Sequence, residues 1–104
     1  QNALTRQGWT VATTPRTRDG GIDLIARRVV DAGGEITLFI QCKNQTHPAS
    51  VDIVRELNGV LPKLQIGTRG VVACSSGFTA DARSFARDRG ILLWDKERLL
   101  ELQA

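Results

Sequence analysis

A short apolar run that ends in a glutamine, a cysteine and a lysine constrains this chain more than any other feature. The run extends from Ile36 to Ile40 and is followed by Gln41, Cys42 and Lys43. Its β-branched and aromatic residues predict a buried strand. Side chains alternate between the two faces of a strand, so Gln41 and Lys43 share one face and Cys42 occupies the other. Because lysine is seldom buried without a partner, its position at the end of this strand indicates a functional site.

A carboxylate lies near the start of a second β-rich segment, just before this strand. Asp23 belongs to the segment 22–30, and residues 31–34 (Asp-Ala-Gly-Gly) separate that segment from 35–43 as a hairpin turn. Carboxylate and amide oxygens suit a hard cation such as Mg²⁺, and an ammonium group can assist hydrolysis. Asp23 together with Gln41 and Lys43 therefore indicates a metal site with a charged helper, as in a nuclease.

The other segments alternate helices and strands. We expect the order α-β-β-β-α-β-α-β-α, with helices at 1–7, 51–61, 80–89 and 96–102 and strands at 9–13, 22–30, 35–43, 70–74 and 91–94. The first three strands can form an antiparallel meander. The later strands alternate with helices, which implies crossover connections and partly parallel pairing. The predicted fold class is α/β, with a mixed central β-sheet flanked by helices.

Small polar residues and glycines mark the ends of the predicted helices. Ser50 and Thr79 are suitable N-caps, and Gly8 and Gly90 stop the helices that precede them. The second helix has an apolar stripe at helical spacing and should end near the following proline, Pro62. The residues of this stripe are Val51, Val54, Leu57, Val60 and Leu61.

Length and charge limit the classes of protein to which the chain can belong. The 104 residues are enough for one core, and we expect a single domain over 1–104 whose first helix continues upstream. No apolar run approaches the roughly 20 residues that span a bilayer, and no signal-peptide pattern is present, so we expect a cytoplasmic protein with no membrane partner. The net charge is +3, and eleven of the fourteen basic residues are Arg, which suits contacts with phosphates.

Several strings of residues follow one another in an order that is typical of one nuclease family. They are RDGGIDLI at 18–25 and FIQCK at 39–43, with further strings at 54–59, 70–72, 77–83 and 90–95. With these strings the chain resembles the catalytic domain of Mrr-type restriction endonucleases, a branch of the PD-(D/E)XK nuclease superfamily that has Gln in place of an acid. The resemblance covers nearly the whole chain. It implies a restriction-endonuclease-like fold, cleavage of DNA with Mg²⁺ or Mn²⁺, and catalytic roles for Asp23, Gln41 and Lys43.

Each residue of the candidate site has a chemical role and a simpler alternative. Asp23 would supply an anionic metal ligand, Gln41 its side-chain oxygen and Cys42 its backbone carbonyl. Lys43 would orient or help deprotonate the attacking water and stabilise the developing charge. Alternatively, Asp23 pairs with one of the two arginines that follow it in the strand. Gln41 would then be a satisfied polar residue, and Lys43 would extend into solvent.

Other polar residues are candidates for contacts with DNA or metal. Hydroxyl and guanidinium groups can hold backbone phosphates, and the candidates are Arg18, Ser75, Ser76 and Arg83. Many members of the superfamily add a Glu from the first helix. Residues 1–8 contain no acid, which leaves Asp19 as a nearby substitute.

The remaining chemically distinctive residues are expected in structural positions. His47 is the single histidine and lies in a predicted loop, where we expect it to be exposed and uninvolved. Trp9 and Trp94 are surrounded by apolar residues, which favours the core over stacking on bases. Cys42 and Cys74 form no metal-binding pattern, so we expect two reduced thiols.

Three functions are compatible with these observations. The preferred one is a Mg²⁺- or Mn²⁺-dependent endonuclease that acts on DNA in restriction, as a homodimer, with a separate DNA-recognition domain outside this chain. The second is a structure-specific nuclease, such as a junction resolvase or repair enzyme, because the superfamily shares this site. The third, from another class, is a DNA-binding or assembly module that has lost cleavage, which the missing first-helix acid would explain.

Overall fold

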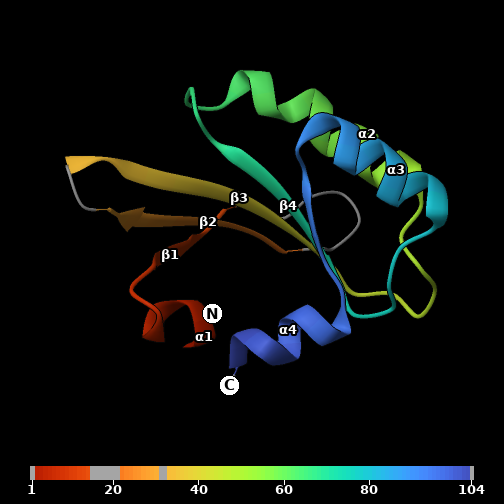
Figure 1. The fold of residues 1–104 in the computed structure, drawn as a ribbon, viewed down its shortest axis with the longest axis horizontal. Helices are drawn as coiled ribbons and strands as arrows, with labels where there is room; N and C mark the ends of the chain where they lie inside the picture. The colour runs from red at the N-terminus through yellow and green to blue at the C-terminus, as the bar shows by residue number, and fades with distance from the viewer. Residues whose placement is uncertain (1, 15–21, 31–32, 104) are drawn as a thin grey trace.

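The computed structural model describes residues 2–14, 22–30 and 33–103. Five strands and four α-helices follow in the predicted order, with one additional 3-10 helix (Figure 1). The elements are α1 (Asn2–Arg6), β1 (Thr10–Thr13), β2 (Ile22–Val29), β3 (Glu35–Lys43), α2 (Val51–Val60), η2 (Leu61–Lys63), β4 (Arg69–Cys74), α3 (Ala80–Arg89), β5 (Leu92–Trp94) and α4 (Lys96–Gln103).

The strands form one mixed sheet in the order β1-β2-β3-β4-β5. The pairs β1–β2 and β2–β3 are antiparallel, and the pairs β3–β4 and β4–β5 are parallel. Parallel neighbours require a crossover, and α2 and α3 provide the two crossovers. The predicted meander and mixed sheet are therefore confirmed.

Helices cover both faces of the sheet, and each face has its own core (Figure 1). On one side, which we call the α2/α3 face, Phe39 packs with Val54, Leu57 and Val72. On the other side, which we call the α1/α4 face, Ile40 packs with residues of α1, β4 and β5. Ile40 directly follows Phe39 in β3. The alternation along β3 thus divides its side chains between two cores.

Most predicted helix ends are confirmed, and one cap differs. The Thr79 side chain accepts a hydrogen bond from Ala82 N, and Gly90 ends α3 with φ of 72°. Ser50 occupies the N-cap position of α2, but its side chain makes no capping hydrogen bond. The Ser50 carbonyl instead accepts from Ile53 N at 3.2 Å. The backbone has therefore engaged the N–H that a capping hydroxyl would use.

The apolar stripe predicted for α2 is only partly correct. Val54 and Leu57 are buried and Leu61 packs against the same core, whereas Val60 is 37% exposed. A helical turn takes 3.6 residues, so side chains spaced every three residues drift around the helix axis. Over the nine residues from Val51 to Val60 this drift reaches about 180°. Ile53 packs against this core instead.

The tryptophans and cysteines occupy the expected structural positions. Trp94 is buried, and Trp9 packs against the core of the α1/α4 face. Cys42 and Cys74 are free thiols, with Cys74 buried and Cys42 half-buried. Among the helices formed by the described residues, none is long and apolar enough to cross a membrane.

Candidate active site

Asp23, Gln41 and Lys43 lie together on the α2/α3 face of the sheet. Asp23 on β2 is directly opposite Gln41 on β3 in the antiparallel register. Residues opposite one another in such a pair share a face, and Lys43 is two positions beyond Gln41 on that face. Phe39, two positions before Gln41, belongs to the core of the same face. The structure therefore brings together the three residues that the sequence singled out.

All three polar side chains are buried. The exposed fractions are 6% for Asp23, 6% for Gln41 and 7% for Lys43, and no other polar or charged residue described here is buried to this degree. Burying a charged or polar group without compensation costs free energy, so such a cluster is unfavourable for stability alone. The simpler alternative of a Lys43 that extends into solvent is therefore wrong.

Two oxygens of this cluster are buried without a hydrogen-bond donor. They are Asp23 Oδ1 and Gln41 Oε1, which belong to the two residues paired across β2 and β3. Buried polar atoms in folded proteins nearly always have a partner, so two neighbouring exceptions require an explanation. One carboxylate and one amide oxygen, on directly opposed residues of one sheet face, fit a hard divalent cation, which prefers oxygen ligands. The chemistry of these two ligand atoms therefore fits a divalent cation.

The ligand set lacks further acids. Among the residues that the structure describes, no three His, Cys, Asp or Glu side chains come close enough to hold a metal ion. A cation between Asp23 and Gln41 would therefore also need main-chain or water oxygens. Asp19, the predicted substitute for a first-helix acid, lies outside the described residues. The helix α1 packs on the α1/α4 face, through Leu4, and not on the face of the cluster.

The electrostatics of the cluster are set by burial. Burial raises the pKa of the Asp23 carboxyl above its ordinary value, and the positive charge of Lys43 opposes this rise. A cation bound at the two oxygens would oppose it further. Burial also raises the pKa of the Cys42 thiol, and the negative charge of Asp23 adds to the effect. Cys42 therefore stays protonated and contributes packing on the opposite face.

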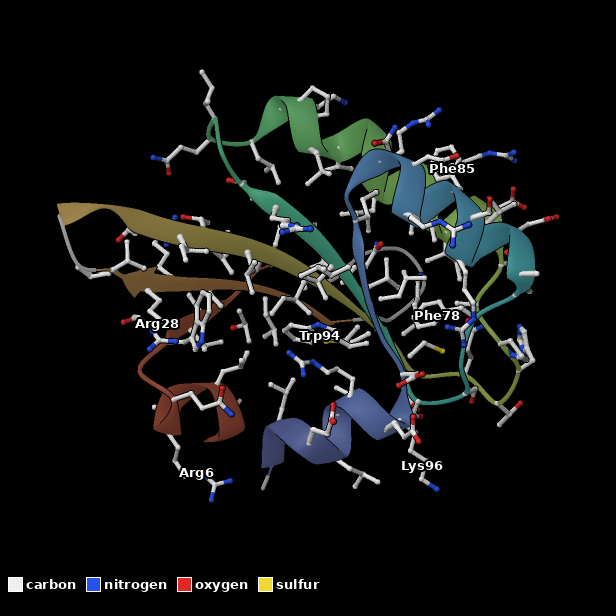
Figure 2. All side chains as sticks on the ribbon, in the orientation of Figure 1. Arg6, Arg28, Phe78, Phe85, Trp94 and Lys96 are labelled. Atoms are coloured by element: carbon white, nitrogen blue, oxygen red, sulfur yellow. The ribbon has the colours of Figure 1, made fainter. Side chains whose placement is uncertain are left out.

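The structure separates Asp23 from the arginines that follow it in β2. Within the described part of the chain, no ion pair joins Asp23 to Arg27 or Arg28. Arg28 points to the α1/α4 side, where its guanidinium carbon lies 6.0 Å from the centre of the Trp9 ring (Figure 2). The simpler alternative of an Asp23–arginine pair is thus wrong, because four or five residues of extended strand hold these groups apart.

Thr14 holds the backbone of Asp23, a contact that the sequence analysis missed. The Thr14 N–H donates to the Asp23 carbonyl at 2.9 Å, and the Thr14 hydroxyl is 3.3 Å from the same oxygen. These contacts extend the pairing of β1 with β2 by one residue beyond Thr13 and Leu24. A polar residue directly after a strand is too common to have drawn attention to Thr14.

The loops that follow β3 and β4 are joined at the end of the sheet next to Lys43. Lys43 is in register with Cys74, so both loops leave from the same edge. Ala49 N donates to the Gly77 carbonyl at 2.9 Å, and the Ser76 hydroxyl donates to the Gln45 carbonyl. The hydroxyl of Ser76 therefore supports the loop, whereas Ser75 next to it is exposed.

The other predicted contact residues are not part of the buried cluster. Arg83 is exposed on α3, and His47 is exposed in the loop after β3, as expected. Arg18 lies outside the described residues. Cys42 is in register with Ile22 on one side and Ala73 on the other, so its carbonyl lies in the plane of the sheet. The proposed roles of these residues as ligands or phosphate contacts remain predictions.

Comparison with known proteins identifies the family. The sequence model of the restriction endonuclease family Mrr_cat matches residues 1–103. The chain belongs to this family. The resemblance to Mrr-type restriction endonucleases is therefore confirmed, and the chain is an Mrr-like restriction endonuclease domain. The type IV methyl-directed restriction enzyme EcoKMrr of Escherichia coli (strain K12) is 36% identical over 87 residues, which are 83% of this chain and 28% of that relative.

Solved structures support the fold of this Mrr-like domain. The DNA modification-dependent restriction endonuclease AspBHI matches with a TM-score of 0.73 and 23% identity, over 96% of this chain and 28% of that chain. The protein AF1548, described as having unknown function, matches with a TM-score of 0.74 and 18% identity, over 96% and 60%. At these sequence identities, structural similarity to the two proteins shows a shared fold and nothing about activity. The chain spans less than a third of EcoKMrr and AspBHI.

Proposed function

We propose that this Mrr-like domain hydrolyses phosphodiester bonds of DNA with a divalent metal ion, Mg²⁺ or Mn²⁺. The observation that carries the proposal is the pair of buried oxygens without donors, Asp23 Oδ1 and Gln41 Oε1, next to the buried ammonium-bearing side chain of Lys43. Membership of the restriction endonuclease family supports a DNA substrate. The burial of three polar groups at one point is explained by catalysis better than by stability.

Each residue of the cluster would have a distinct role in the reaction. Asp23, Gln41 and the backbone carbonyl of Cys42 would hold the metal ion. Such an ion supplies charge neutralisation on the phosphate and activation of a water molecule. The ammonium group of Lys43 would donate hydrogen bonds to the attacking water, fixing its orientation, and to the phosphate oxygens as negative charge develops. Thr14 would keep the Asp23 backbone at the correct position relative to β3.

Contacts outside the cluster would bind the DNA backbone. Ser75 is exposed at the edge where the two loops meet, and Arg83 is exposed on α3. We assign both to phosphate contacts, together with Arg18. Ser76 would instead hold the loop that presents Ser75 to the phosphate, because its hydroxyl proton is donated to the Gln45 carbonyl. Because EcoKMrr and AspBHI are much longer than this chain, we also propose that DNA recognition in the whole protein uses a separate domain. Cleavage of both strands requires two sites, which a homodimer on DNA would supply.

Nicking of supercoiled plasmid tests the proposal. The chain should convert supercoiled plasmid to the open-circular form with Mg²⁺ or Mn²⁺, and excess EDTA should stop the reaction. Asp23→Asn, which keeps the size of the side chain but removes its charge, should be inactive. Folded wild-type chain that leaves the plasmid intact with both metals would contradict the proposal and favour a DNA-binding module. Comparison of linear, methylated and four-way-junction DNA would then distinguish restriction-type from structure-specific cleavage.

A further inference from the structure

A small hollow lies on the α2/α3 face beside the candidate active site. Its volume is about 60 Å³, and it lies between β2, β3 and the segment that leads from η2 into β4. Arg27 of β2 and Thr37 of β3 line it, and they are directly opposite one another in the register. Gln65 and Thr68 line it from the η2–β4 segment, and its apolar wall is formed by Ile25, Phe39 and Leu64.

The polar lining of this hollow consists of hydrogen-bond donors without partners. The donors are the Arg27 guanidinium, the Gln65 amide and the hydroxyls of Thr37 and Thr68. Within the described part of the chain, none of these side chains makes a hydrogen bond or an ion pair. None of the described residues that line the hollow carries a carboxylate. The nearest acid on the same face of β3 is Glu35, two residues beyond Thr37 toward the hairpin.

The η2–β4 segment is held in a defined turn. Thr68 N donates to the Gln65 carbonyl at 3.1 Å, and Gly67 has φ of 90°, a conformation that favours glycine. The turn fixes the backbone of Gln65 and Thr68, whose side chains line the same hollow as those of Arg27 and Thr37.

The size and charge of the hollow select the class of ligand. A volume of about 60 Å³ is well below the ~150 Å³ of a cavity that holds a benzene ring, which suits a compact tetrahedral oxyanion better than a planar base. One permanent positive charge with two hydroxyls and one amide is the set of donors that commonly contacts DNA phosphates. The donors therefore indicate a phosphate group.

The position of the hollow relates it to the reaction site. Asp23, Ile25 and Arg27 are alternate residues of β2 and share the α2/α3 face, and four residues of strand span ~13 Å. Successive phosphates of one DNA strand both rise along the duplex axis and wind around it, so this separation corresponds to a phosphate only a few nucleotides from the one that is cleaved. We propose that the Arg27 hollow binds a second backbone phosphate, on the same strand as the phosphate that is cleaved at Asp23. This inference rests on the proposed nuclease function.

Arg27 and its neighbour Arg28 form a matched pair for testing this proposal. They are consecutive in β2 and both exposed, so strand alternation directs their side chains to opposite faces of the sheet. Arg28 lies on the α1/α4 side, over Trp9 (Figure 2). Arg27→Gln and Arg28→Gln change the net charge equally. Binding of each variant to a short labelled duplex is measured by fluorescence anisotropy over a range of salt concentrations, in EDTA so that the DNA stays intact.

The salt dependence of binding provides the first readout. Loss of one phosphate contact should reduce the slope of log K against log salt by about 0.9 in Arg27→Gln and leave it unchanged in Arg28→Gln. In plasmid nicking with Mg²⁺, Arg27→Gln should raise KM by about tenfold with kcat largely retained, since the contact positions DNA before the reaction. Arg27→Lys should recover part of the slope, because it restores the charge. Thr68→Val, which removes one hydroxyl, should raise KM less.

Equal slopes for Arg27→Gln and Arg28→Gln, whether both reduced or both unchanged, would overturn the inference. Circular dichroism and the melting temperature of each variant check that the fold is retained. The nuclease proposal has a separate test. It is contradicted if the wild-type chain does not nick plasmid in any metal, and the salt slopes of DNA binding then still show whether Arg27 contacts a phosphate.

Discussion

Asp23 and Gln41 stand directly opposite one another on β2 and β3, and each keeps one buried side-chain oxygen without a hydrogen-bond donor. The register of an antiparallel pair brings such side chains within about 5.5 Å at their Cβ atoms. A single cation can therefore be shared by both oxygens. Lys43, two residues further along β3, adds a positive charge on the same face. The pairing accounts for why an acid and an amide, far apart in sequence, form one site.

Neutralising Asp23 should stabilise the fold while removing activity. Burial raises the pKa of Asp23 above its ordinary value of 3.8, so the folded state favours the protonated carboxyl. The stability associated with this group is present below pH 3.8 and is lost as pH rises through the folded pKa. In EDTA, Asp23→Asn should therefore melt at a higher temperature than wild type at pH 7, and the difference should vanish below pH 3.8. Thermal denaturation over this pH range is the measurement. A lower melting temperature for Asp23→Asn at pH 7 would show that the ionised carboxylate is stabilised in the metal-free protein.

Removal of Lys43 should abolish nicking. Lys43→Ala removes the buried ammonium group and should lower the rate of plasmid nicking by at least about a hundredfold, in the range typical of catalytic acid–base groups. The matched control is Lys63→Ala, because Lys63 is exposed on η2 and distant from the cluster in the chain. Both rates are measured at saturating Mg²⁺ after circular dichroism has verified folding. Nicking by folded Lys43→Ala at the rate of Lys63→Ala would remove Lys43 from the mechanism.

The hydroxyl of Thr14 should contribute to the position of Asp23. Thr14→Val keeps the branched shape and the backbone hydrogen bond but loses the hydroxyl contact to the Asp23 carbonyl. We expect a loss of about 0.5–1.5 kcal/mol in the free energy of unfolding and a lower kcat. Thr10→Val is the control, since Thr10 is exposed on the same strand. Urea denaturation and plasmid nicking measure the two effects. A Thr14→Val variant that matches Thr10→Val in both would show that the backbone pairing alone positions Asp23.

The fold could be predicted from the sequence because local signals agreed with the long-range pairing. The segments 22–30 and 35–43 were predicted to pair as a hairpin, and β2 and β3 are antiparallel neighbours, although residues 31 and 32 of the predicted turn lie outside the described residues. Thr79 and Gly90 fixed the ends of α3. The errors arose where two local options compete. Ser50 has a suitable hydroxyl, but its own carbonyl satisfies the Ile53 N–H. Val60 fitted a spacing of three residues, yet the 3.6-residue period turns it toward solvent.

The three clustered residues could be predicted because alternation along β3 and the hairpin register are simple rules. The surrounding contacts could not, because they depend on segments that are distant in sequence. Thr14 reaches Asp23 across nine residues. The Arg27 hollow exists only because the η2–β4 segment folds back over β2 and β3. No local sequence pattern indicates either contact, so both could be identified only from the structure.

The Mg²⁺ dependence of nicking in Gln41 variants tests the central claim most directly. If Gln41 Oε1 binds the cation, Gln41→Glu supplies an oxygen at the same place with an added negative charge and should hold Mg²⁺ more tightly. Gln41→Leu has no ligand atom. The competing idea is that the Gln41 NH₂ group donates a hydrogen bond, which an ionised Glu cannot do. The half-maximal Mg²⁺ concentration is measured for wild type and both variants. The account predicts that Gln41→Glu nicks DNA at a lower Mg²⁺ concentration than wild type while Gln41→Leu is inactive, and a folded but inactive Gln41→Glu would contradict it.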